Sequence, residues 1–184
     1  MRSGGRSVSI DGVIIVSGVP GAGKSTIAAL LAARFERGVH VEADALQRMI
    51  VSGARWPGEE PIDEGYRQLR LRGRNTCLVA DSFRQAGFVP VLDDIVVGSR
   101  VGEFLADLAS RPVYLVMLLP DLETLERRNA ERAKTDVFHQ SLELDPIARN
   151  ETRRAGLRID TSRQSPTESV EAVLARLEAD ARIA

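Results

Sequence analysis

Short apolar runs alternate with longer amphipathic segments along this chain. The apolar runs predict five strands, at Val13–Ser17, Val39–Glu42, Val89–Asp93, Val113–Leu119 and Gly156–Ile159. The run at 113–119 is apolar throughout, which is typical of a strand that is covered on both faces. Strands that alternate with helical segments in this way predict an α/β fold with a parallel sheet.

The segments between these runs predict helices. We expect helices at Lys24–Arg37, Asp44–Val51, Ile62–Ala86, Arg100–Ala109, Asp121–Ala133, Asp145–Arg154 and Thr167–Ala181. Two prolines and two glycines interrupt the pattern between positions 53 and 61, so this stretch, which carries Trp56, is expected to be a loop. Residues 1–10 are expected to be a disordered lead, and residues 11–184 a single domain, because no repeat or long linker divides them.

One motif lies directly between the first predicted strand and the first predicted helix. It fits the phosphate-binding pattern G-x-x-x-x-G-K-[ST] and, with the threonine that follows, comprises Gly18, Val19, Pro20, Gly21, Ala22, Gly23, Lys24, Ser25 and Thr26. Glycines let successive N–H groups point at phosphate oxygens, and the positive end of the next helix dipole adds to the attraction. Lys24 is expected to reach the β- and γ-phosphates, and Ser25 to ligate Mg²⁺. The chain is therefore expected to bind a nucleoside triphosphate.

Composition and charge exclude several classes of partner. The chain has 25 basic and 26 acidic residues, so no basic excess favours a nucleic-acid surface. No apolar stretch approaches the roughly 18 residues of a membrane helix, and no secretory signal is recognisable, so we expect a cytoplasmic protein. Cys77 is the only cysteine, which excludes intramolecular disulfides and cysteine zinc sites, and it is expected to be a buried thiol.

An aspartate follows the second predicted strand, in His40-Val-Glu-Ala-Asp44. Ligands of open parallel sheets bind beyond the carboxyl ends of the strands, where the phosphate-binding loop also lies. Asp44 could therefore accept the proton of a substrate hydroxyl as it attacks the γ-phosphorus. Asp44 and Gln47 could equally form a capping box for the next helix, and the two roles can coexist.

Two aspartates end the third predicted strand. An apolar run that closes on Asp93 and Asp94 has the form of the second nucleotide motif, whose carboxylate holds Mg²⁺ directly or through water. Successive strand residues face opposite ways, so the two aspartates are not expected to share one role. We favour Asp93 as the metal ligand and expect Asp94 to face the substrate. Two acidic residues at a strand exit with no ligand are the alternative.

Arginines are concentrated after the fourth predicted strand. Arg128 and Arg132 are four positions apart and share one helix face. Guanidinium groups in this arrangement suit a phosphoryl group in transfer, whose developing charge they offset. The pairs Glu123–Arg127 and Arg132–Asp136 also have this spacing, so a solvated, salt-bridged face is the alternative.

These segments together resemble the small P-loop phosphotransferases. The chain is similar over nearly its whole length to chloramphenicol phosphotransferase-like proteins and zeta-toxin-like AAA family ATPases, and more distantly to gluconate, shikimate and nucleoside monophosphate kinases. The resemblance rests on the phosphate-binding loop, on the segments ending in Asp44 and in Asp93-Asp94, on the arginine-rich helix, and on Ile159-Asp-Thr-Ser162.

The resemblance implies a fold and roles for several residues. It implies a five-stranded parallel sheet in the order 2-3-1-4-5 with helices on both faces, and a mobile lid at about 127–145. It also implies Asp44 as the group that activates the acceptor hydroxyl, Arg128 and Arg132 as lid arginines, and the loop at 159–162 as the adenine-side wall. The chain departs from the pattern where many relatives carry an arginine three residues after the aspartate. Gln47 stands there and Arg48 follows, so a phosphorylated acceptor is less well supported.

These observations predict an ATP- and Mg²⁺-dependent kinase that phosphorylates a hydroxyl group of a small molecule such as an antibiotic, a sugar or a nucleoside. Lys24, Asp44, Arg128 and Arg132 are the predicted catalytic residues, and the metal is assigned to Ser25 and Asp93. Contacts with the acceptor are assigned to Asp44, Arg48, Trp56 and Asp94, with Trp56 either stacking on the substrate or packing on the protein. The alternative is a regulatory P-loop ATPase without a small-molecule acceptor. We expect no nucleic acid or membrane partner, and a homodimer is one of the open oligomeric states.

Overall fold

The protein is described by a computed structural model that covers residues 10–131, 135–152 and 155–184, with no side chains described at 131–138. The strands are β1 (Val13–Ser17), β2 (Gly38–Glu42), β3 (Val89–Asp93), β4 (Val113–Leu118) and β5 (Leu157–Ile159). The α-helices are α1 (Lys24–Ala32), α2 (Ala43–Arg48), α3 (Ile62–Gln85), α4 (Arg100–Asp107), α5 (Leu122–Glu131), α6 (Thr135–Pro146) and α7 (Pro166–Asp180). A π-helical turn, η1 (Ile147–Glu151), follows α6.

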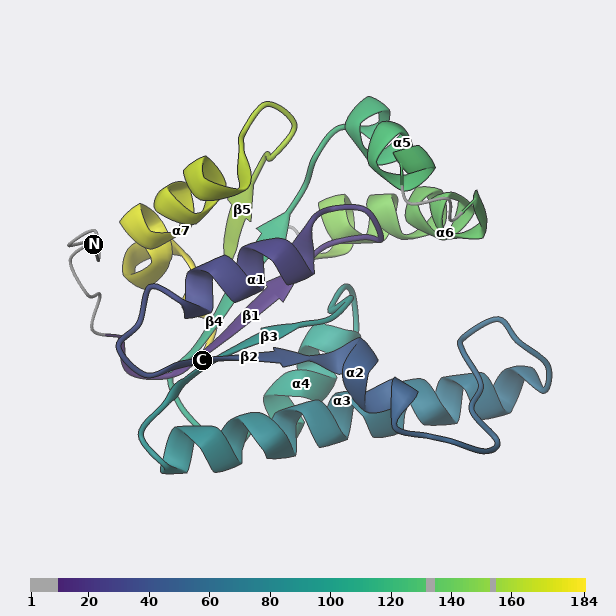
Figure 1. Cartoon of the computed structure of the whole chain (residues 1–184), viewed down its shortest axis with the longest axis horizontal. Coiled ribbons are helices and arrows are strands. Elements are labelled where there is room, and N and C mark those ends of the chain that lie inside the picture. Colours follow the sequence, from purple (N-terminus) through teal and green to yellow (C-terminus); the bar gives the residue numbers. More distant parts are fainter. Residues whose placement is uncertain (1–9, 132–134, 153–154) are drawn as a thin grey trace.

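The strands form one parallel sheet in the order β2-β3-β1-β4-β5. This confirms the predicted fold class and strand order. All five strands end at the same edge of the sheet, and β2 and β3 are in register so that Glu42 lies beside Asp93. The phosphate-binding loop after β1 and the aspartates after β2 and β3 are thereby brought to a single edge (Figure 1).

Two layers of helices cover the two faces of the sheet, with α1 and α7 on one face and α3 and α4 on the other (Figure 1). The strand β1 shows how the sequence builds both layers. Its side chains alternate, so that Ile14 and Val16 pack in the core under α1 and α7, whereas Val13 and Ile15 pack with α3 and α4. A strand buried on both faces must be apolar at every position, which is the pattern found in its sequence.

The region after β4 differs from the prediction. A helix was expected from Asp145, but α6 covers 135–146 and is followed by the π-helical turn. Pro146 lacks the N–H that would continue the α-helical ladder, so the helix changes its hydrogen-bonding pattern there. The helix α1 ends at Ala32, five residues earlier than expected.

The remaining expectations about the chain are met in part. Cys77 is buried, as expected, and burial raises the pKa of its thiol to about 12. Residues 1–9 of the predicted disordered lead lie outside the described residues, whereas Ile10 packs into the core. Among the described residues, none of the helices has the length and apolar character of a membrane span.

Candidate active site

The phosphate-binding loop closes on itself through its backbone. The Ala22 N–H donates to the Val19 carbonyl at 3.1 Å, and Gly23 adopts φ +94° where α1 begins. A residue with a side chain rarely adopts this conformation, so glycine fits there. The first turn of α1 has no side-chain cap and no acidic residue. Uncapped N–H groups at a helix start form an anion site, as a polyphosphate requires.

The last three residues of the motif have different contacts. Lys24 Nζ lies 3.2 Å from the Val19 carbonyl oxygen, within the loop that it is expected to serve. Ser25 Oγ donates a hydrogen bond to Asp93 Oδ2. Thr26 lines a cavity together with Ala22 and Gly23 of the loop.

Ser25 and Asp93 together fit a magnesium site. Both offer oxygen, which is the donor that Mg²⁺ prefers, and their direct hydrogen bond shows that the two groups meet. No cluster of three or more histidine, cysteine or acidic side chains that could hold a metal exists among the described residues. A nucleotide-bound Mg²⁺ needs no such cluster, because phosphates and waters supply most of its ligands.

Asp93 has a second partner. The imidazole Nε2 of His40, on β2, lies 3.0 Å from Asp93 Oδ1. The His40 side chain is 22% exposed, and the Asp93 side chain is 4% exposed. Each carboxylate oxygen of Asp93 is therefore held by a different element, one by α1 and one by β2.

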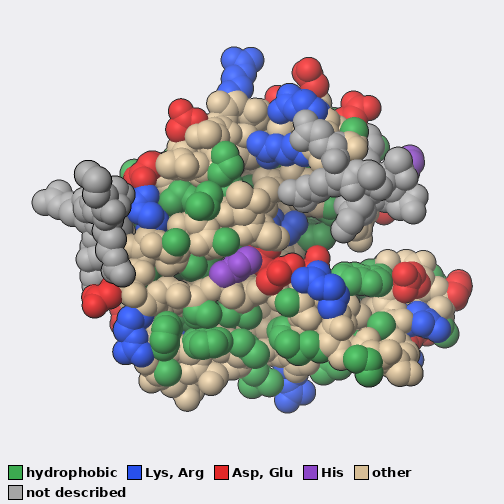
Figure 2. All heavy atoms as spheres, in the orientation of Figure 1, with side chains coloured by type: hydrophobic (Ala, Val, Ile, Leu, Met, Phe, Trp, Pro, Cys, Tyr) green, Lys and Arg blue, Asp and Glu red, His purple; other side chains and the backbone are tan. Residues whose placement is uncertain are grey.

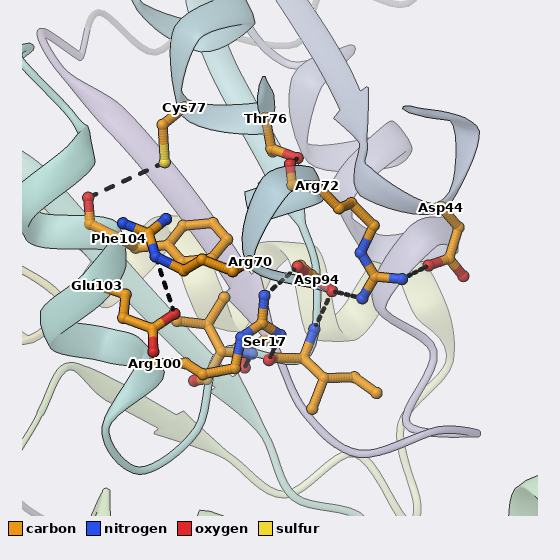
Figure 3. Close-up of polar contacts among 12 residues, drawn as sticks. Ser17, Asp44, Arg70, Arg72, Thr76, Cys77, Asp94, Arg100, Glu103 and Phe104 are labelled. Carbon is orange, nitrogen blue, oxygen red and sulfur yellow. Dashed lines mark hydrogen bonds and ion pairs between the residues drawn. The ribbon is translucent and has the colours of Figure 1, made fainter. Parts of the chain in front are cut away.

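Asp44 lies at the start of α2 and is linked to α3 (Figure 3). Arg72 Nη1 donates to Asp44 Oδ1 at 3.1 Å, and Arg72 Nη2 donates to Asp94 Oδ1 at 2.7 Å. Arg100 Nη2 donates to Asp94 Oδ2 at 2.8 Å. The four residues thus form a continuous chain from α4 to Asp44, at whose end the Asp44 side chain is 53% exposed.

The two carboxylates in this chain differ in their electrostatics. Loss of water around Asp44 raises its pKa above the ordinary value, and Arg72 opposes the rise. Burial also tends to raise the pKa of Asp94, but the guanidinium groups of Arg100 and Arg72 outweigh it and hold that pKa below the ordinary value. Asp94 is therefore a fixed negative charge, whereas Asp44 has the raised pKa of a group that can accept a proton.

Asp94 is placed differently from the expectation that turned it toward the substrate. Its side chain is 2% exposed, and its oxygens accept from Arg72, Arg100 and the Ile95 N–H. Arg72 Nε is buried and has no hydrogen-bond partner among the described residues. The exposed end of this network is thus Asp44, and the buried Arg72 guanidinium joins it to Asp94.

The predicted loop after α2 is anchored by two buried amides. Gln47 Nε2 donates to the Arg55 carbonyl at 3.0 Å, and Gln68 Oε1 accepts from the Arg55 N–H at 2.7 Å. The capping box considered for Asp44 and Gln47 is not formed, because α2 begins at Ala43 and Gln47 is engaged with the loop. Trp56 is exposed, and its ring lies 5.5 Å from the centre of the Arg72 guanidinium. The loop therefore stands beside the Asp44 side of the site.

The arginines assigned by sequence have different outcomes. Arg128 Nη2 donates to the Thr161 carbonyl at 3.0 Å, and Nη1 lies 3.3 Å from the Ala22 carbonyl oxygen. The residue lines a cavity of about 260 Å³ with Ala22, Gly23, Thr26, Ile27, Thr161, Gln164, Pro166 and Ser169. This cavity lies at the expected adenine-side wall. Arg132 lies outside the described residues, and Arg48 is exposed and pairs with Glu42 at 2.9 Å.

The space-filling view shows acidic and basic side chains gathered near the middle of this face of the molecule (Figure 2). The cavity that Arg128 lines includes Ala22 and Gly23 of the phosphate-binding loop, whereas Asp44 lies after β2 at the start of α2.

Sequence reasoning missed His40, Arg72 and Arg100. A weak signal for Arg72 exists, because Gln68, Arg72 and Thr76 recur at intervals of four on one face of α3, and all three are buried. His40 is a single histidine in a short strand, and no pattern distinguishes it from a structural residue.

Comparison with protein families gives one match. The family model described as an AAA domain matches residues 13–146. This range begins at β1 and ends with α6, so it includes the phosphate-binding loop, both aspartate segments and Arg128. No curated protein matches the chain.

Several solved structures share the fold. An unliganded sugar kinase from Janibacter sp. HTCC2649 has a TM-score of 0.63 at 21% identity, covering 89% of this chain and 92% of that chain. Shikimate kinase from Acinetobacter baumannii, in complex with shikimate, has a TM-score of 0.63 at 19% identity, with 89% and 90% covered. Shikimate kinase from Aquifex aeolicus has a TM-score of 0.60 at 16% identity, with 90% and 96% covered. These likenesses confirm a kinase-like P-loop fold.

Proposed function

The chain belongs to this AAA domain family, and we propose that it transfers the γ-phosphoryl group of ATP to a hydroxyl group of a small molecule. The observation that carries the proposal is the placement of Asp44. Its half-exposed carboxylate stands at the same sheet edge as the phosphate-binding loop and is held there by Arg72. A regulatory ATPase needs only the phosphate-binding loop. A phosphotransferase also needs a group that removes the proton of the acceptor, and a carboxylate with a raised pKa near the loop suits this role.

In the proposed reaction, the acceptor oxygen attacks the γ-phosphorus and an O–P bond forms. The bond between the γ-phosphorus and the bridging oxygen breaks, ADP leaves with that electron pair, and the hydroxyl proton passes to Asp44. The raised pKa of Asp44 favours this transfer. Arg72 holds one Asp44 oxygen and thereby orients the carboxylate, and buried Asp94 holds Arg72.

The nucleotide would be held by groups around the loop. We assign the triphosphate to the backbone of 18–23 and to Lys24, and the base to the cavity lined by Thr161 and Pro166. Ser25 and Asp93 would hold Mg²⁺, which when bound offsets charge on the β- and γ-phosphates. We further propose that Arg128 and Arg132 offset charge on the transferring group, a role for which Arg128 would have to leave the Thr161 carbonyl.

The acceptor would lie between Asp44 and the loop that carries Trp56. This exposed ring beside Arg72 offers a face for a sugar or aromatic ring. Arg48, exposed near the start of the same loop, is a second candidate contact. We assign Asp94 a supporting role, since its oxygens are already bonded within the protein. An ATP-dependent reaction of this kind is consistent with a cytoplasmic location.

An ADP-release assay with panels of sugars, nucleosides, small alcohols and antibiotics tests the proposal. We expect one chemical class to stimulate ADP release and to gain a phosphate ester that mass spectrometry detects. Stimulation by a macromolecule alone, with no small molecule modified, would instead support the regulatory ATPase.

The variant Asp44→Asn tests the base. We expect turnover with the true acceptor to fall by about 10²-fold or more, because the amide cannot accept the proton. Its affinity for ATP, measured by calorimetry, should stay near that of the wild type. Asp180→Asn is a matched control on the surface of α7 and should turn over normally. Normal turnover of the Asp44 variant would remove Asp44 from the reaction.

A further inference from the structure

We propose that His40 is a positioning residue for the magnesium site, and that it acts through Asp93. The inference rests on the proposed nucleotide site but concerns a residue that no nucleotide motif contains. His40 Nε2 lies 3.0 Å from Asp93 Oδ1, while Ser25 Oγ donates to Asp93 Oδ2. Among the described residues, these two side chains are the hydrogen-bond partners of the carboxylate.

The sheet register makes this contact possible. Strands β2 and β3 run parallel, and His40 pairs with Val91 while Glu42 pairs with Asp93. The imidazole therefore reaches forward by two residues, from the level of Val91 to Asp93 at the strand end. An ionised carboxylate only accepts hydrogen bonds, so the imidazole must donate through Nε2–H. His40 thus fixes the rotation of the Asp93 carboxylate from the edge strand.

The two partners of Asp93 would play different parts in a magnesium site, because Ser25 would itself ligate the cation whereas His40 contacts only the carboxylate. A serine hydroxyl has one proton and two lone pairs, so Ser25 could ligate the cation and still donate to Asp93. The His40 bond is on the opposite oxygen and can persist. His40 would thus hold the orientation of the Asp93 carboxylate from outside the metal site, as partners behind a ligating group do.

A purely structural role for His40 would affect stability but not metal binding. The side chain is 22% exposed on an edge strand, and a pair of this kind could simply stabilise the sheet. In that case its loss would lower the free energy of unfolding without changing metal affinity. In the proposed role, metal affinity falls while binding of the metal-free nucleotide is unchanged.

The experiment measures Mn²⁺ binding to the complex of the full chain with ADP, by electron paramagnetic resonance. Mn²⁺ serves as a visible substitute for Mg²⁺, and no acceptor is needed. The variants are His40→Leu, which removes the donor, His40→Gln, whose longer amide can reach Asp93, and His40→Asn, whose amide is too short. Asp93→Asn serves as the reference for loss of the ligand itself. ADP affinity in the presence of EDTA is measured for each variant.

We expect His40→Leu and His40→Asn to weaken Mn²⁺ binding by about tenfold, and His40→Gln to restore most of that loss. ADP affinity in EDTA should be the same in all of them. Should His40→Leu fail to fold, the comparison of the Gln and Asn variants decides the matter. Equal Mn²⁺ affinity in those two variants, or wild-type affinity in His40→Leu, would overturn the inference.

Failure of this inference is distinguishable from failure of the proposed function. If no small molecule is ever phosphorylated, the Mn²⁺ titration still reports whether His40 orients Asp93. If His40 has no effect on the metal, the acceptor panel and the Asp44 variant still test the phosphotransferase.

Discussion

Replacement of Asp94 by asparagine removes the negative charge that lies between two arginines. Asp94 accepts from Arg72 at 2.7 Å, from Arg100 at 2.8 Å and from the Ile95 N–H at 2.8 Å. Asparagine has nearly the same shape but offers one acceptor and one donor. The NH₂ group of the asparagine would face a guanidinium N–H. The Arg72 side chain, which is 5% exposed, would then have only the exposed Asp44 carboxylate as its ionic partner.

The size of the effect follows from this burial. Breaking a buried, hydrogen-bonded ion pair from one side costs about 3–5 kcal/mol, because the remaining charge stays away from water. For a chain of this length, that loss corresponds to a decrease in Tm of about 6–20 °C. The pKa of Asp94 is held below its ordinary value, so its contribution should be complete at neutral pH. It should be lost only in acid, as the pH falls through that lowered pKa.

Urea unfolding at neutral pH, followed by circular dichroism, measures the loss. Asp107→Asn is the matched control, because Asp107 on α4 pairs with Arg70 on α3 and so joins the same two helices at the surface. An exposed pair of this kind contributes about 0–1 kcal/mol. The reasoning is refuted if Asp94→Asn destabilises the protein no more than Asp107→Asn does.

Two further predictions concern the loop and the base. Gly21→Ala should weaken ATP binding and destabilise the fold by about 1–3 kcal/mol, because Gly21 has φ +80° and a Cβ would meet the Asn129 side chain at 2.8 Å. Gly102→Ala is the control, because Gly102 lies on α4 with open space around it; this variant should leave ATP affinity unchanged and keep or raise the free energy of unfolding. Calorimetry and urea unfolding measure the two quantities, and equal results for both variants would show that Gly21→Ala introduces no strain. Arg72→Met should raise the pKa of Asp44 further, since Arg72 opposes the existing rise, and so move the acidic loss of activity to higher pH. A carbon NMR titration of the Asp44 carboxylate measures its pKa without an acceptor. The control Arg70→Met should leave this pKa unchanged. An unchanged or lower pKa in Arg72→Met would show that Arg72 does not oppose the rise.

The sheet could be predicted because its strands are specified locally. The strands β1 and β3 have the predicted bounds, since each is an apolar run that ends where polar residues begin. The helix α6 was missed because tertiary contacts define it. Ser141 on this helix is fully buried and donates to the Pro20 carbonyl at 3.0 Å, and Leu144 packs against the core. A sequence pattern does not contain contacts that far apart.

Some residues of the candidate site could be predicted from the sequence and others could not. The phosphate-binding loop, Asp44 and Asp93 follow strand ends, and parallel strands deliver their ends to one edge, so their proximity could be inferred. Arg72 could not be chosen in this way, because four of the eight residues from 67 to 74 are arginines. Which of them points inward depends on how α3 is rotated against the sheet, and that rotation is set by burial of residues such as Gly73 and Cys77.

For the proposed phosphotransferase, the charge balance around Asp44 favours an uncharged acceptor over a phosphorylated one. Two carboxylates, Asp44 and Asp94, are matched by two guanidinium groups, Arg72 and Arg100, so the network has no excess positive charge to offer a second phosphate. Gln47 brings no positive charge to the site, and its amide is used to anchor the loop. An acceptor that brought two further negative charges would compete with Asp94 and Asp44 for Arg72 and would be repelled by the proposed base, Asp44. A neutral polyol or ring alcohol meets no such penalty and leaves the carboxylate free to act.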